Sequence, residues 1–235
     1  MAIPDRMDER LRALGLVEGQ RAALALFAEV TRRALIAAGR SEFEVTDRIG
    51  DLARELWGTR VRWSGRIVRS GPHAVLPSGD EPPADRIICA DDTVTLHLGP
   101  VLGGHGTDFT GTVVLGDEPA KLRLREDLTE VFAAGREAFH ADPRITGRQL
   151  YADLQALAAK SGWTLGGWHG GHLAGEAPAA DPMCAQADAY IGPDNDQPLR
   201  RTTPGGWKAH WLLEVHLIDE HAGFGGSHKA LLDLV

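Results

Sequence analysis

The order of secondary-structure signals along the chain limits its possible folds most strongly. Residues 6–38 and 41–58 carry apolar residues at helical spacing, and Ser41 with Glu44 forms the pattern of a capping box. Strand signals follow at 60–70, 86–90, 93–98 and 109–115. Helices followed by strands are typical of an α+β domain.

The second half of the chain has the same order of signals. Helices are expected over 117–144, with Pro119 near the start, and over 146–162. A connection rich in Pro, Asp and Gly then leads to an apolar strand over 210–219, and after a tight turn a last strand is expected over 229–235. We therefore expect two similar halves, although the sequence shows no internal repeat.

Composition excludes several classes of function. The 235 residues are enough for one substantial core, so we expect a single domain over 1–235. A net charge of −8, without a Lys/Arg cluster interleaved with aromatic residues, argues against a nucleic-acid partner. No apolar run approaches the roughly 20 residues that span a bilayer, so no membrane partner is expected. A charged N-terminal segment and only two cysteines favour the cytoplasm.

Histidines and carboxylates within apolar strands indicate where the chemistry lies. Glu214 lies inside the segment WLLEVHL, where a carboxylate is costly to bury unless it is paired or bound to a metal. His97 lies in an apolar strand, Asp108 follows eleven positions later, and His172 and His228 come soon after Gly-Gly pairs. Such groups at the ends of several strands are the usual ligands of Zn, Mn, Co or Fe. The pattern predicts a metal site, and the alternative is a buried ionic network without metal.

Five segments, taken in their order and spacing, carry a family resemblance. They are SGPHAVLPSGD, DDTVTLHLGPVLGGHGTDFTGTVVLG, GGHLAGEAP, WLLEVHL and GGSHKALLDLV. With these segments the chain resembles the creatinase, prolidase and methionine aminopeptidase family, in a short prolidase-like form without the N-terminal domain that many members carry. The resemblance implies the pita-bread fold, an α+β architecture of two pseudo-symmetric halves with a curved antiparallel sheet and flanking helices. It also implies a homodimer.

The resemblance further implies a centre of five ligands, two Asp, one His and two Glu, that holds two metal ions. By position these ligands fall on His97, Asp108, His172, Glu214 and His228, so two carboxylates are replaced by histidine. His169 competes with His172 for the histidine position. Because a neutral imidazole offers one nitrogen and no charge, whereas a carboxylate can bridge two cations, we expect one divalent ion (Fe, Mn, Zn or Co).

Other residues near these ligands are candidates for catalysis and substrate binding. His169, Glu176 and His216 are expected to carry protons, although each also has an ordinary structural interpretation. His73 lies on a loop that approaches the substrate in the family that the chain resembles. Arg200, in the long loop 192–206, is expected to pair with a substrate carboxylate, unless it belongs to a solvated turn.

These expectations combine into a predicted function. The chain is expected to be a metalloenzyme that cleaves a C–N bond, peptide-like or amide-like, of a small amino-acid-derived or short-peptide substrate. One alternative is an oxygen-dependent oxidase, oxygenase or lyase with non-haem Fe(II), for which His97, Asp108 and His228 form a suitable ligand set. Another is a metal-free hydrolase similar to creatinase, in which a histidine is the acid and base.

Overall fold

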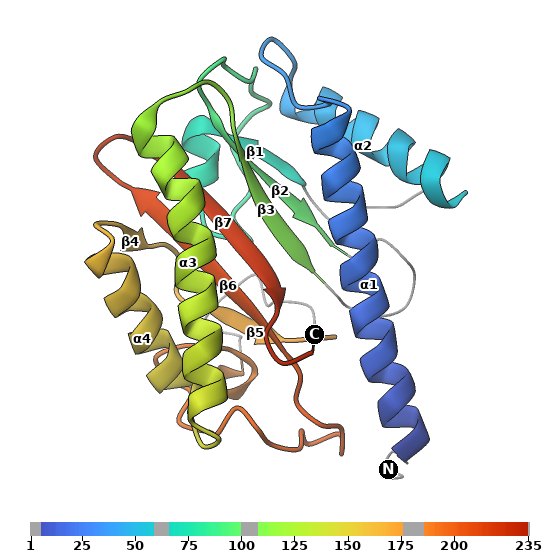
Figure 1. Cartoon of the computed structure of the whole chain (residues 1–235), viewed down its shortest axis with the longest axis vertical. Coiled ribbons are helices and arrows are strands. Elements are labelled where there is room, and N and C mark those ends of the chain that lie inside the picture. Colours follow the sequence, from blue (N-terminus) through green and yellow to red (C-terminus); the bar gives the residue numbers. More distant parts are fainter. Residues whose placement is uncertain (1–5, 59–65, 100–107, 176–185, 235) are drawn as a thin grey trace.

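The computed structural model describes residues 6–58, 66–99, 108–175 and 186–234, and in these the chain forms helices and strands in the predicted order (Figure 1). The first half contains α1 (Arg6–Arg32), α2 (Glu42–Trp57), β1 (Val68–Ser70), the 3-10 helix η1 (Gly71–Val75), β2 (Thr93–Leu98) and β3 (Phe109–Val114). The second half contains α3 (Pro119–Ala141), α4 (Gly147–Lys160), β4 (Thr164–Leu165), β5 (Gly171–Leu173), the 3-10 helix η3 (Ala187–Ala189), β6 (Trp211–Asp219) and β7 (Phe224–Leu231).

The strands form one antiparallel sheet in the order β1-β2-β3-β7-β6-β4, and β5 also pairs with β6. β3 and β7 therefore join the strands of the two halves in the middle of the sheet. Helices α1 and α3 cross one face of it, with α1 over β3 and α3 over β6 and β7 (Figure 1). None of the helices in the described ranges is long and apolar enough to cross a membrane.

The register separates an apolar face of the sheet from a polar one. Because directly paired residues of antiparallel strands point to the same face, each pair assigns both its members. The face toward the helices carries buried apolar side chains, among them Leu96, Leu213 and Val215. The opposite face carries polar side chains from six strands. These are Arg69, Thr95, His97, Thr110, Thr112, His172, Glu214, His216, Ser227 and Lys229.

Most of the predicted elements that fall on described residues are confirmed, and two differ. The segment 86–90 forms no strand but a single bridge between Ser41 and Ile87. The last strand begins at Phe224 instead of residue 229. Its glycines allow close packing, since a Cβ on Gly225 would lie 2.9 Å from Ile218 Cγ2 and 3.0 Å from the carbonyl oxygen of Ala74 in η1. The register with β6 assigns the faces, with His228 opposite Val215 and Lys229 opposite Glu214.

Candidate functional site

A buried lysine between two carboxylates lies at the centre of the polar face. Lys229 Nζ is 2.8 Å from Asp108 Oδ2 and 3.0 Å from Glu214 Oε2. Lys229 and Glu214 are directly paired across β7 and β6, and Asp108 immediately precedes β3. The side chains of Lys229 and Glu214 are 2% and 4% exposed, whereas that of Asp108 is 25% exposed, so the cluster meets solvent at Asp108.

The second oxygen of Glu214 is held by two serines. The hydroxyl of Ser78, in the loop after η1, donates to Glu214 Oε1, and Ser227 Oγ on β7 donates to the same atom over 3.5 Å. Arg69 holds that loop, because its guanidinium donates to the carbonyl oxygens of Pro77 and Asp80, each at 2.8 Å. The loop residues 77–80 are thereby fixed beside the cluster.

The charges of this cluster stabilise one another. Burial alone would raise the pKa values of Asp108 and Glu214, but the charge of Lys229, together with smaller contributions such as the hydrogen bond from Ser78 to Glu214, outweighs burial and holds the pKa of both below the ordinary values. Burial alone would lower the pKa of Lys229, but the two carboxylates raise it well above the ordinary range. All three groups are therefore charged at neutral pH.

Two histidines beside the cluster have opposite tautomers. His172 Nδ1 lies 3.0 Å from the carbonyl oxygen of Leu173, which can only accept, so Nδ1 carries the proton and Nε2 has the lone pair. His169 Nδ1 accepts from the N–H of Gly171 at 3.2 Å, so in the neutral ring the proton is on Nε2. The ring centroids are 6.3 Å apart. One imidazole offers an acceptor and the other a donor.

Both rings are neutral at physiological pH. Burial lowers the pKa of His172, with Lys229 acting in the same direction, and burial lowers the pKa of His169 to about 4. His172 is 3% exposed, and its Nε2 is buried without a hydrogen-bond partner among the described residues. A buried lone pair without a donor is costly unless a ligand or water supplies one.

His97 and His216 lie on the same face but differ in their surroundings. Burial, followed by the charges of Arg69 and Lys229, lowers the pKa of His97 to about 3, and its Nδ1 lies 3.3 Å from Thr110 Oγ1. His216 Nε2 donates to the carbonyl oxygen of Ala74 at 2.9 Å, and burial lowers its pKa. With one ring nitrogen bonded in this way, His216 fastens β6 to η1, and its expected role in proton transfer stays a prediction.

His228 lies on the other face of the sheet, and the expectation that it joins the other four candidate ligands is corrected here. It is directly paired with the core residue Val215. Its ring packs edge-on against Phe132 of α3, with centroids 4.6 Å apart, and burial lowers its pKa to about 4. The residue of β7 that does face His97, Asp108, His172 and Glu214 is its neighbour, Lys229.

The residues present do not fit the predicted metal centre. A divalent ion would require carboxylate oxygens of Asp108 and Glu214 as ligands. Asp108 Oδ2 and Glu214 Oε2 are instead paired with the ammonium group of Lys229, which has no lone pair with which to bind a metal ion. Within the described residues, no three His, Cys, Asp or Glu side chains form a group that could hold a metal ion. The arrangement matches the alternative stated from the sequence, a buried ionic network.

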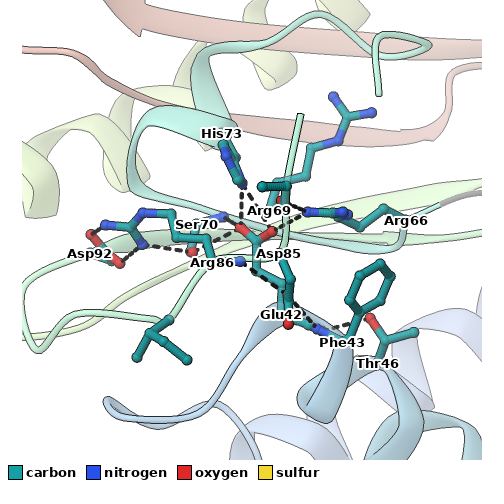
Figure 2. A network of polar contacts seen from close by, with 12 residues as sticks. Glu42, Phe43, Thr46, Arg66, Arg69, Ser70, His73, Asp85, Arg86 and Asp92 are labelled. Atoms are coloured by element: carbon teal, nitrogen blue, oxygen red, sulfur yellow. Dashed lines mark hydrogen bonds and ion pairs between the residues drawn. The ribbon is translucent and has the colours of Figure 1, made fainter. Parts of the chain in front are cut away.

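His73 belongs to a second polar network, built around the buried carboxylate of Glu42 at the start of α2 (Figure 2). His73 Nδ1 lies 3.0 Å from both oxygens of Glu42, and Arg66 Nη1 lies 2.9 Å from Oε2. Ser70 donates to Oε1 through its backbone N–H, at 2.6 Å, and through its hydroxyl, at 2.9 Å. This network fixes η1 against α2, and a substrate contact by His73 stays a prediction.

Two further candidates lie outside the cluster or outside the described part of the chain. Arg200 stacks on the ring of Phe139, with its Cζ 3.9 Å from the centroid, and donates to the carbonyl oxygens of Phe139 and Asp142. It therefore caps the end of α3, and its expected pairing with a substrate carboxylate stays a prediction. Glu176 lies outside the described residues.

Sequence reasoning missed Lys229, Ser78 and Glu42. For Lys229 a signal was available, because Glu214 in an apolar strand requires a partner and a lysine stands in the next strand, KALLDLV. The role of Ser78 depends on how the loop folds over β6. Glu42 looks like an ordinary first-turn carboxylate of a helix, and its burial becomes evident only from the tertiary contacts.

Comparisons with known proteins agree with this architecture. The family model described as metallopeptidase family M24 matches residues 17–202. A search of curated proteins found no match. Among solved structures, an X-Pro aminopeptidase from Thermotoga maritima MSB8 superimposes with a TM-score of 0.70 at 19% identity, over 97% of this chain and 58% of that one.

Two other solved structures have the same fold. The dipeptidase PepE from Mycobacterium ulcerans has a TM-score of 0.66 at 24% identity, over 92% of this chain and 54% of that one. A methionine aminopeptidase from Thermotoga maritima has a TM-score of 0.63 at 15% identity, over 98% of this chain and 92% of that one. The chain thus spans little more than half of the first two proteins and nearly all of the third.

Proposed function

The chain belongs to metallopeptidase family M24 and has the pita-bread fold, and from this premise we propose that it is a peptidase-like hydrolase that works without a metal ion. Its substrate is a small amino-acid-derived molecule or a short peptide, and the bond that it breaks is a C–N bond. The substrate binds on the polar face of the sheet, next to the Lys229 cluster. The iron-dependent alternative gains no support from the comparisons and is not proposed.

The pair His169 and His172 supports this proposal most directly. Their fixed, opposite tautomers provide an acceptor and a donor side by side, which is what general acid and base catalysis requires. Because burial keeps both rings neutral, His172 is ready to accept a proton at physiological pH. Nε2 of His172 is buried and has no hydrogen-bond partner in the described part of the chain, so a bound water could donate a hydrogen bond to it.

The reaction follows from these positions. A water molecule gives a proton to His172 Nε2 while its oxygen attacks the electrophilic carbon of the substrate. His169 Nε2–H donates a hydrogen bond to the charge that develops on the substrate, as a positioned donor does in acyl transfer. The C–N bond breaks when the proton on His172 passes to the leaving nitrogen. Asp108, Glu214 and Lys229 keep a fixed set of charges around the imidazoles.

The test is an amine-release assay on the purified full-length chain with a panel of dipeptides, X-Pro peptides and N-acyl or amidino amino acids. With an accepted substrate, His172→Gln should lower kcat by a factor of about 10² to 10⁴, the usual contribution of a general base. His221→Gln, the same substitution at an exposed turn position, should change kcat little.

Two results would contradict the proposal. Turnover by His172→Gln at the rate of the unmodified chain would remove His172 from the mechanism. Absence of turnover across the whole panel, with the protein folded, would argue against hydrolysis. The homodimer expected from the family resemblance stays a prediction and does not affect this assay.

A further inference from the structure

The family to which the chain belongs is one of metallopeptidases, yet a protonated lysine lies between the two carboxylates of its polar face. Lys229 Nζ bonds both Asp108 and Glu214, and its side chain is 2% exposed. The hydrolase proposal does not by itself explain a buried ammonium at this point. An uncompensated buried carboxylate pair would be very costly, so some cation must be present there.

We propose that the Lys229 ammonium takes the place of a divalent cation in this chain. It is a built-in cation that holds Asp108 and Glu214 in position and excludes metal ions from them. The inference concerns the same site as the proposed hydrolase, but it does not require that the protein be a hydrolase.

Distances and charge support this assignment. The Lys229 Nζ–Asp108 Oδ2 contact of 2.8 Å is a charge-assisted hydrogen bond and the Nζ–Glu214 Oε2 contact of 3.0 Å is an ion pair, whereas metal ions bind carboxylate oxygens at about 2.0–2.2 Å. The two carboxylates carry two negative charges, of which Lys229 already balances one. A divalent ion added to them would leave a net positive charge in a buried region that also contains the guanidinium of Arg69.

Lys229 also cannot readily leave the cluster. Its backbone lies in the middle of β7 and is paired with Thr110 of β3 on one side and with Glu214 of β6 on the other. The side chain therefore starts on the polar face, and no rotation about its own bonds can carry it through the sheet to the helices. For a metal ion to enter, the ammonium would have to break two ion pairs and find new partners.

The same geometry predicts that one substitution restores a metal site. In Lys229→Glu the cation is removed and a third carboxylate is added next to Asp108 and Glu214. His172 Nε2, which accepts no hydrogen bond from any described residue, supplies an imidazole nitrogen with a lone pair. Three carboxylates and one imidazole form a common ligand set for Mn²⁺, Co²⁺ or Zn²⁺.

The test is calorimetric titration of the full chain with MnCl₂ and with CoCl₂, together with the thermal unfolding temperature with and without metal. The unmodified chain should give no binding at millimolar metal and no shift in Tm. Lys229→Glu should bind at least one equivalent and unfold at a higher temperature when metal is present. Lys160→Glu, the same charge change at the exposed end of α4, should behave like the unmodified chain.

Each outcome bears on the inference. Binding of one equivalent by the unmodified chain, lost in Asp108→Asn, would overturn it, and so would a folded Lys229→Glu chain that binds no more metal than Lys160→Glu. If Lys229→Glu does not fold, the titration of the unmodified chain still decides the point. Failure of the amine-release assay would count against the hydrolase alone, because metal binding is read without any substrate.

Discussion

Lys229 links the chemistry of individual residues to the stability of the fold. Each carboxylate beside it is buried or half-buried, and each depends on its ammonium to remain charged. Removing one partner of a buried ion pair lowers the free energy of unfolding more than replacing all the partners with uncharged residues does. The reason is that removal of one partner leaves a buried charge without compensation. The three residues are therefore best treated as one unit.

This interpretation predicts the effect of removing the lysine charge alone. Lys229→Met, which keeps the length of the side chain, should lower the free energy of unfolding by about 3–5 kcal/mol at neutral pH. Adding Asp108→Asn and Glu214→Gln to it should recover much of that loss, since no charge is then left buried. Urea unfolding followed by circular dichroism measures both. A Lys229→Met chain as stable as the unmodified one would show that the three charges are not coupled.

Among the helices and strands, the sequence predicts correctly the strands in which apolar and polar residues alternate clearly. It does not predict the start of a strand where glycines interrupt this alternation. The alternation over 93–98 and 109–115 gives β2 and β3, and the helical spacing after Pro119 gives α3. The stretch Phe224 to Ser227 contains two glycines and has weak strand propensity, so the last strand is predicted to start too late. The family resemblance places the last ligand at His228, one position before Lys229, and because successive residues of a strand point to opposite faces, that position lies on the wrong side of the sheet.

Some features of the candidate site could be predicted from the sequence and others could not. His97, Asp108, His172 and Glu214 are expected together because the family resemblance implies it, and the register places His97, His172 and Glu214 on one face of the sheet. The role of Arg200 could not be predicted, because a loop arginine gives no local signal of the helix end that it caps. The tautomers of His169 and His172 depend on single backbone groups and are visible only in the structure.

Strand β5 places His172, and its geometry gives a prediction at this scale. Gly171 has a φ of +138°, and a Cβ there would lie 2.0 Å from the carbonyl oxygen of Leu212 on β6. Gly171→Ala should therefore lower the free energy of unfolding by at least about 1–3 kcal/mol through backbone strain, and should also lower kcat by displacing His172.

The matched control is Gly50→Ala, in the interior of α2, where a Cβ would meet open space. It should raise the free energy of unfolding by about 0.4–1 kcal/mol and leave kcat unchanged. Urea unfolding and the amine-release assay measure both variants. If Gly171→Ala were as stable as Gly50→Ala, the close pairing of β5 with β6 would be incorrect.

Across the whole molecule, burial keeps several histidines neutral at physiological pH. Burial lowers the pKa of His97 to about 3 and those of His169 and His228 to about 4, and it also lowers those of His172 and His216. Below the ordinary value of 6.5 the unfolded chain takes up protons on these residues, whereas the folded chain does not until a lower pH. Stability must therefore fall as the pH falls from about 6.5 toward 4.

The substitution His228→Phe tests the predicted direction of this pH dependence. In that pH range, each histidine that stays neutral in the folded chain lowers the free energy of unfolding by at most about 1.4 kcal/mol for each unit by which the pH falls. The variant lacks one such histidine, so its free energy of unfolding should fall with pH less steeply by about that amount. A phenyl ring also suits the contacts with Phe109 and Phe132. Urea unfolding at about pH 7 and about pH 5 gives the slope, with His221→Gln as the exposed control. A slope unchanged from that of the unmodified chain would contradict a neutral, buried His228.

The acidic groups and the lysine do not reverse this trend. The pKa values of Asp108 and Glu214 are lowered, so their contribution is present at neutral pH and is lost only as the pH falls through the low values that they have in the folded state. The pKa of Lys229 is raised, so its contribution is present throughout the acid range and is lost only in strong base.

Exclusion of metal by Lys229 is tested most directly by a crystal structure of the unmodified chain grown with excess Mn²⁺, with anomalous scattering recorded at the manganese edge. We expect no anomalous peak at Asp108 and Glu214, and density for the Lys229 side chain within hydrogen-bond distance of both carboxylates. A manganese peak bonded to both carboxylates, with the Lys229 side chain displaced, would contradict this exclusion.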